Sequence, residues 1–389
     1  MTTSKTRIAL SAFLFVSTYA WAAKKPVELV RASAAPAEAS LLNIHITVFD
    51  HADDFIPEVR RAEARYLPVL LKQTLQTAGF WGTVRVVPDV PEKGDVDLDV
   101  SGAVRVSHGG ELKLEVRAID ATGKVWLDKD YKAKPDASAY LDKNSAEDPF
   151  REVYHRIAND LSKKYKKLKA KDVERIRTLS RLRFAADLAP DAFADYLVVK
   201  KKNRFEIARL PSRDDPMMER VTLVRDRNGM FIDTVDSYYV SLFEKMRESY
   251  RGWRSQDYWQ REAMKNGPPT ATGSGGRNAP WGVLIAGDGP AGAGQGLTCG
   301  TPGLFGNGST REDERRWEQE RRRTHLDVLR ELGESLASDV TPLLVEVDGN
   351  VTELTGSVET QYVKWRTLLR KIFAAETGLP VGSQQATSY

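Results

Sequence analysis

Apolar and polar residues alternate at the start of the first structured region, where Ile44, Ile46 and Val48 are separated by polar side chains. Alternation with a period of two predicts a half-buried strand. Residues 57–79 then change to the three-to-four spacing of an amphipathic helix. Gly79 is placed to end that helix as a C-cap glycine.

Further alternating segments follow the helix up to residue 133, with a hairpin turn predicted at residues 107–110. The order of one strand, one helix and then several strands predicts a helix packed on an antiparallel sheet. Over residues 43–133 this order resembles small envelope domains such as the amino-terminal domain of the TolB family. The resemblance implies a role in envelope assembly and supplies no site residues.

Helical spacing dominates the middle of the chain. Residues 148–165 begin with an Asp-Pro start signal and carry one apolar face. Residues 214–264 predict long, aromatic-rich helices, with an N-cap at Asp214 and Asp215 for which a catalytic carboxylate pair is the alternative. Their aromatic residues predict helix core, and a sugar- or peptide-binding groove is the alternative. These residues are Tyr238, Tyr239, Phe243, Tyr250, Trp253, Tyr258 and Trp259.

The stretch from Val283 to Gly294, VLIAGDGPAGAG, contains a G-x-G-x-x-G after a short apolar run. A dinucleotide site needs a helix to begin directly after these glycines, so that its amino terminus holds the pyrophosphate. Further glycines and Pro302 follow instead, and they would not sustain a helix. We therefore predict a mobile Gly/Pro-rich linker here and no cofactor.

The last region predicts a charged helix, a hairpin and a closing helix. Its second strand is predicted to continue through Ser357 to Val358. With Gly349 at the turn and Leu354, Gly356 and Val358 in the L-x-G-x-V pattern, residues 324–376 resemble the BON module of bacterial envelope proteins. The phase of Thr352 and Glu353 departs from the module's pattern. The resemblance implies binding of phospholipid or partner proteins, and it brings no catalytic residues.

The first residues predict a cleavable export signal. A short basic segment precedes an apolar core, and Ala20 and Ala22 satisfy the small-residue rule for cleavage after Ala22. A retained anchor is the alternative. Cleavage would leave a periplasmic protein with no transmembrane span in the mature chain, and mean hydropathy of −0.43 excludes a multi-span membrane protein.

These patterns together predict an α+β protein with a helix-on-antiparallel-sheet domain, an α-helical middle domain and a small BON-like α-β-β-α domain. The predicted segments are a signal peptide (1–22), a flexible lead (23–42), an α+β domain (43–135), a helical domain (148–264), a disordered linker (265–310), a charged helix plus BON-like domain (311–376) and a disordered tail (377–389).

The reactive residues form no recognisable catalytic or metal-binding arrangement. The single cysteine, Cys299, excludes an internal disulfide, and the five histidines lack the spacing of a metal site. His45 and His108 are predicted at the surface. The formal net charge of +4 does not by itself imply a nucleic-acid binder, and the predicted export argues against nucleic acid as a partner.

One basic cluster stands out: Lys163, Lys164, Lys166, Lys167, Lys169 and Lys171. These lysines predict contact with an anionic lipid or cell-wall polymer, and a solvated helix face is the alternative. The sequence therefore favours a non-enzymatic periplasmic envelope protein that binds partner proteins or an anionic surface. The alternative is a hydrolase of cell-wall glycan or peptide that uses carboxylates of the middle region.

Overall fold

The computed structural model describes residues 26–51, 57–90, 96–135, 137–141, 147–212, 214–266, 320, 323–332, 343–347 and 350–378. Several predicted features lie outside these residues. They are the signal peptide with Ala20 and Ala22, the Gly-rich stretch with Cys299, the turn glycine Gly349, and most of the predicted linker and tail.

Helices and strands are mixed along the described chain, as the predicted α+β class requires. The elements up to the first long helices are η1 (Glu38–Ser40), β1 (Ile44–Thr47), β2 (Asp50–His51), α1 (Pro57–Ala78), β3 (Val84–Val87), β4 (Leu98–His108), β5 (Glu111–Asp120), β6 (Val125–Ala133), α2 (Ser138–Leu141), α3 (Arg151–Tyr165) and α4 (Ala170–Leu188). The remaining elements are α5 (Pro190–Phe193), η2 (Ala194–Tyr196), β7 (Leu197–Lys200), β8 (Arg204–Ile207), α6 (Pro216–Asn266), β9 (Leu343–Val347), β10 (Asn350–Leu354) and α8 (Val358–Thr377).

The main sheet has the strand order β3-β1-β4-β5-β6, and β2 also pairs with β4. The prediction of a wholly antiparallel sheet is wrong, because β1 runs parallel to both β3 and β4. Only β4, β5 and β6 form an antiparallel meander. Since β1 lies inside the sheet, all four of its residues are buried, including His45 at 6% exposure. His45 is therefore not a surface residue.

Helices α1, α3 and α6 complete the core of this sheet. Helix α1 contacts β3 and α6, α3 lies on β6, and α6 contacts β3. Gly79 has a φ of +73°, as the predicted C-cap glycine of α1 requires. Buried apolar residues of all these elements belong to one continuous cluster. The segments predicted as 43–135 and 148–264 thus share a core.

The segment before β1 lies along α3. Asn159 accepts a hydrogen bond from the Val30 N–H and donates one to the Glu28 carbonyl, both at 2.8 Å. His155 contacts the Val27 carbonyl through Nδ1 at 2.7 Å. The described part of the predicted flexible lead is therefore held to α3 by hydrogen bonds between its own backbone and side chains of that helix.

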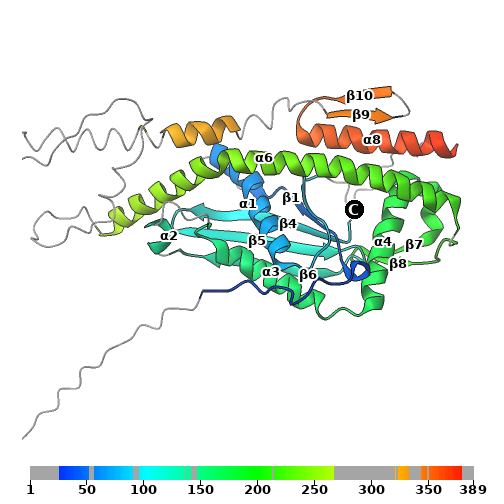
Figure 1. The fold of residues 1–389 in the computed structure, drawn as a ribbon, viewed down its shortest axis with the longest axis horizontal. Coiled ribbons are helices and arrows are strands. Elements are labelled where there is room, and N and C mark those ends of the chain that lie inside the picture. The colour runs from blue at the N-terminus through cyan, green and yellow to red at the C-terminus, as the bar shows by residue number, and fades with distance from the viewer. Residues whose placement is uncertain are drawn as a thin grey trace, which may run out of the picture.

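The long aromatic-rich region is a single 51-residue helix, α6. Asp215 accepts a hydrogen bond from the Met217 N–H, which confirms the predicted helix start. The helical middle region also contains a hairpin that the sequence analysis missed, in which β7 and β8 pair in antiparallel register. Figure 1 shows α6 running along the length of the molecule, with the sheet on one side and α8 on the other.

The carboxy-terminal region contains a helix over residues 323–332, the antiparallel pair β9–β10, and α8. The second strand ends earlier than predicted. Ser357 is the N-cap of α8 and accepts a hydrogen bond from the Thr360 N–H, so neither Ser357 nor Val358 belongs to the strand. The closing helix buries its predicted apolar face, including Tyr362, Trp365 and Leu369. The resemblance to the BON module stays a prediction.

Among the described helices, none combines the length and the apolar character that a membrane crossing requires.

Candidate functional site

Three of the six predicted lysines gather at one surface hollow. Lys163, Lys164 and Lys167, near the end of α3, line a hollow of about 330 Å³. Strand β6 forms its opposite wall. The wall residues are Trp126, Leu127, Asp128 and Lys129, and Asp160 of α3 completes the lining. We refer to these eight residues as the lysine hollow.

The lining of the lysine hollow carries excess positive charge. It contains four lysines and two aspartates. Asp160 is already engaged, because it pairs with Lys129 at 2.5 Å and accepts the Tyr131 hydroxyl hydrogen at 2.9 Å. Among the described residues, no carboxylate lies within ion-pairing distance of Lys163, Lys164 or Lys167. Their charges are available to a ligand.

The lysines point to solvent because of their position at the end of α3. Its apolar face, which includes Ile157 and Leu161, is fully buried, so the remaining face is exposed. Lys163 and Lys164 occupy the last turn, where the carbonyl end of the helix dipole favours cations. The end of α3 therefore favours a cluster of positive charge beside β6.

The other three predicted lysines lie elsewhere. The ammonium of Lys166 is 4.7 Å from the centre of the Phe80 ring. Lys169 precedes α4, and its backbone N–H donates to Asp172 at 3.0 Å. Lys171 is an exposed residue in the first turn of α4. The turn between α3 and α4 thus divides the cluster that is continuous in sequence.

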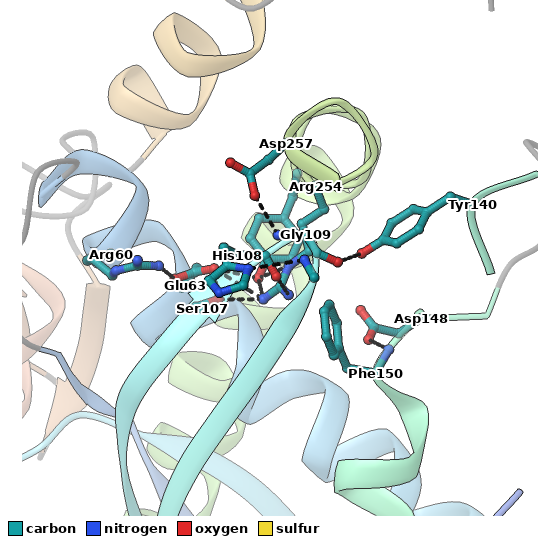
Figure 2. Close-up of polar contacts among 12 residues, drawn as sticks. Arg60, Glu63, Ser107, His108, Gly109, Tyr140, Asp148, Phe150, Arg254 and Asp257 are labelled. Atoms are coloured by element: carbon teal, nitrogen blue, oxygen red, sulfur yellow. Dashed lines mark hydrogen bonds and ion pairs between the residues drawn. The ribbon is translucent and has the colours of Figure 1, made fainter. Parts of the chain in front are cut away.

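A second charged centre, which the sequence analysis did not predict, surrounds Arg254 of α6. Its side chain is 1% exposed. The guanidinium donates to the Ser107 hydroxyl at 2.7 Å, to Glu63 at 3.2 Å and to the Tyr250 hydroxyl, where the distance from Nε is 2.7 Å. Figure 2 shows Arg254, Glu63 and Ser107 converging between α6, α1 and the end of the β4–β5 hairpin. We refer to them as the Arg254 centre.

Glu63 of α1 is the counter-charge of this centre, and its side chain is fully buried. It accepts hydrogen bonds from Ser107 at 2.5 Å and from Tyr250 at 2.8 Å. Arg60 also pairs with it, at 2.5 Å. A buried charge is tolerated only when it is paired and its hydrogen bonds are satisfied, and Glu63 meets both conditions.

The tip of the β4–β5 hairpin is fastened to α6 at the same place. The Gly109 N–H donates to Asp257 at 2.8 Å, and the Tyr140 hydroxyl donates to the Gly109 carbonyl at 2.6 Å (Figure 2). A Cβ at Gly109 would overlap the backbone of Arg254 and Tyr258. Glycine is therefore required for this close approach of hairpin and helix.

Burial and nearby charges shift the pKa values of Asp148 and Arg254. Burial raises the pKa of Asp148 above its usual range, and the positive charge of Arg254 opposes this shift. Burial would lower the pKa of Arg254, but Tyr250, Glu63 and Asp148 raise it above its usual value. The guanidinium therefore stays charged across the whole physiological pH range.

This centre has the properties of a structural anchor. The carboxylates of Glu63 and Asp257 and the guanidinium of Arg254 are all engaged by protein groups. Phe150 covers the guanidinium with its ring centre 4.4 Å away. Nothing in this arrangement favours the alternative of a hydrolase, which stays a prediction.

Five of the seven aromatic residues predicted for the core of α6 are core residues. Tyr239, Phe243, Tyr250, Trp253 and Tyr258 are buried, and Tyr66 of α1 stacks against the ring of Phe243 at 4.5 Å. This confirms the predicted core role for these five residues, whereas Tyr238 and Trp259 are only half-buried. Within the described ranges, no group of three or more His, Cys, Asp or Glu side chains is placed to hold a metal ion.

A signal for the Arg254 centre exists in the sequence. Arg254 follows Tyr250 by four residues and Trp253 by one, so it lies on the apolar face of its helix. Glu63 lies next to Ala62 and three residues before Tyr66, on the apolar face of another helix. Opposite charges on two apolar faces indicate a buried ion pair, but sequence spacing does not say which helices meet.

The comparisons with known proteins identify no family. No family model and no curated protein matches the chain. A PelC dodecamer variant from Paraburkholderia phytofirmans aligns over 33% of this chain and 92% of that chain, with 17% identity and a TM-score of 0.22. A Xanthomonas campestris protein of family DUF330 aligns over 38% and 90%, with 10% identity and a TM-score of 0.20. Likenesses at these scores carry no argument about the function of this chain.

Proposed function

We propose that this chain is a non-enzymatic protein of the bacterial envelope, exported to the periplasm, that binds an anionic surface through the lysine hollow. The observation that carries the proposal is the placement of Lys163, Lys164 and Lys167 in one hollow without a carboxylate partner among the described residues. The predicted export signal places the ligand in the envelope. The envelope offers three kinds of anionic surface, which are phospholipid headgroups, lipopolysaccharide and acidic wall polymers.

The energetics are sufficient for weak, salt-sensitive binding. Each lysine held near an anionic bilayer contributes about 1 kcal/mol, and three therefore supply roughly a hundredfold in affinity. The contribution falls as salt screens the charges over a Debye length of about 10 Å at 0.1 M ionic strength. Binding that is strong at low salt and weak at high salt is the expected signature.

The test is co-sedimentation of the purified chain with phosphatidylglycerol-containing vesicles and, separately, with lipopolysaccharide. The variant carries Lys163→Glu, Lys164→Glu and Lys167→Glu together, and we expect it to lose about a hundredfold or more in affinity at low salt. The matched control carries the same charge change at Lys245, Arg323 and Lys371, which are exposed on other elements.

The control separates a local site from the effect of net charge. We expect the control variant to bind within about twofold of the unmodified chain, because its lost charges lie outside the hollow. Equal losses in the two variants would show that net charge alone drives binding. No binding by the unmodified chain to either probe would overturn the proposal.

A further inference from the structure

The hairpin of β7 and β8 is a second basic surface, which neither the predicted lysine cluster nor the hollow includes. A two-stranded sheet is marginal on its own and needs a packed face. Here Leu197, Phe205 and Ile207 pack against the core. The guanidinium of Arg183 also lies over the Phe205 ring at 4.2 Å. The hairpin is therefore held in place at its base.

The free end of this hairpin is strongly basic. Lys200, Lys201, Lys202 and Arg204 are all exposed within five residues. Lys200 lies 3.8 Å from Glu206, at the limit of an ion pair between two half-exposed side chains. Among the described residues, no carboxylate pairs with the other three cations.

The turn holds these cations in an unusual backbone conformation. Lys202 has a φ of 62° and Asn203 a φ of 52°, both in the left-handed region. Glycine and asparagine enter this region most easily, whereas lysine enters it at a cost in energy. The chain thus carries a lysine at a position where the fold alone would favour glycine.

Two exposed apolar side chains lie directly beside the cations. Val198 is 37% exposed and Val199 is 51% exposed. Because directly paired residues share a face, Val199 lies with Phe205 on the face that packs against the core, and Val198 lies with Lys200 and Arg204 on the opposite face. Apolar side chains flanked by lysines are typical of protein segments that lie in the interface of an anionic membrane.

The hairpin and the lysine hollow flank the same turn of the main sheet. The Phe205 N–H donates to the Thr122 carbonyl at 2.9 Å, and Gly123 lies so close to the Asn203 backbone that a Cβ would overlap it. Trp126, three residues after Gly123, lines the lysine hollow. Three residues of strand span only about 10 Å. Figure 1 shows β7 and β8 at the end of the molecule beside α4.

We infer that the β7–β8 hairpin binds the surface of an anionic phospholipid bilayer. Its cations contact headgroup phosphates, and Val198, on the face away from the core, enters the boundary between headgroups and acyl chains. This inference rests on the proposed function and makes it more specific, because a soluble acidic polymer offers phosphates but no apolar layer. The exposed side chain of Val198 distinguishes the two ligands.

The test compares two probes, vesicles of phosphatidylglycerol with phosphatidylethanolamine and soluble polyphosphate. The first variant carries Val198→Thr, which keeps the branched shape of the strand residue. We expect it to bind vesicles about tenfold more weakly and polyphosphate unchanged. The second variant carries Lys201→Glu and Lys202→Glu, and we expect it to lose at least tenfold on both probes.

A matched control replaces exposed apolar residues elsewhere, as Leu223→Gln with Met230→Gln on α6, and we expect unchanged vesicle binding. Circular dichroism verifies that every variant is folded. Vesicle binding by the threonine variant that equals that of the unmodified chain would overturn the inference. If the hollow variant loses binding while both hairpin variants keep it, the proposed function stands without the hairpin. If the unmodified chain binds neither probe, both proposals fail.

Discussion

The Arg254 centre and the lysine hollow hold positive charge in opposite ways. Arg254 is buried, and Glu63, Ser107 and Tyr250 surround it with hydrogen bonds. The lysines of the hollow are exposed, and three of them lack a carboxylate partner among the described residues. The difference teaches that burial forces a charge to be paired, whereas an exposed charge is free to serve a ligand.

The largest effect is expected from the substitution Arg254→Met, which tests whether the Arg254 centre stabilises the fold. It leaves Arg60 as the one remaining cationic partner of the buried Glu63 among the described residues, so we expect a loss of about 3 kcal/mol in the free energy of unfolding. Urea denaturation followed by circular dichroism measures it. The control Lys245→Met on the exposed side of the same helix is expected to change stability by no more than about 0.5 kcal/mol. A similar small effect for Arg254→Met would show that the centre is not an anchor.

The second test concerns the hairpin tip. Gly109→Ala places a methyl group against the backbone of α6, and the hairpin has to shift away from Asp257. We expect a loss of about 1–3 kcal/mol in unfolding free energy. Gly110→Ala is the matched control, because its added Cβ makes only an ordinary contact with His108. Equal effects at the two glycines would contradict the close approach described here.

A smaller effect is expected at Asp148, whose contribution to the unfolding free energy depends on pH. Burial raises the pKa of Asp148 in the folded chain above its unfolded value. Its stabilising contribution is therefore complete below the unfolded pKa of about 3.9 and is lost as pH rises through the folded pKa. Asp148→Asn removes this titration and keeps an acceptor for the Phe150 N–H.

Urea denaturation at a series of pH values measures the difference. The stability of Asp148→Asn relative to the unmodified chain should rise with pH above the ordinary aspartate range and then become constant. Parallel pH profiles for the two proteins would show that Asp148 titrates normally.

The smallest effect on stability is expected at the lysine hollow. Replacing Lys163, Lys164 and Lys167 by Gln removes charges that make no ion pair with the described residues. We expect each replacement to change the unfolding free energy by less than about 0.5 kcal/mol, with a slight gain from relieved repulsion. Thermal unfolding at low and high salt measures it. A large loss would mean that these lysines support the fold, as Arg254 does.

The boundaries of helices were predictable where local chemistry decides them. Gly79 ends α1, and Asp215 begins α6, because each satisfies backbone groups within one turn of its own position. Strand pairing was not predictable from alternation alone. The pattern at Ile44 and Ile46 predicts a strand, but it does not reveal that β1 pairs in parallel with two neighbours and is buried on both faces.

The candidate site was likewise predictable only where local sequence decides the structure. The run from Lys163 to Lys171 was visible as charge, but the turn after α3 decides which lysines meet β6. The β7–β8 hairpin was missed because its turn contains Lys202 and Asn203 in place of glycine, and because it lies between two predicted helical segments. Long-range partners such as Glu63 and Arg254 depend on how two helices pack, which no local pattern contains.

The pairing of Glu63 with Arg254 also fixes an order of events in time. The two residues are 191 positions apart, so the chain emerges from the ribosome with Glu63 long before its partner exists. Contacts this distant in sequence require a large loop to close before they return any energy, which slows folding. An unfinished chain that ends before α6 would expose the acidic residue and the apolar surface around it. The buried pair therefore forms only after α6 docks on α1, and α8, which follows α6 in the chain, completes the same core.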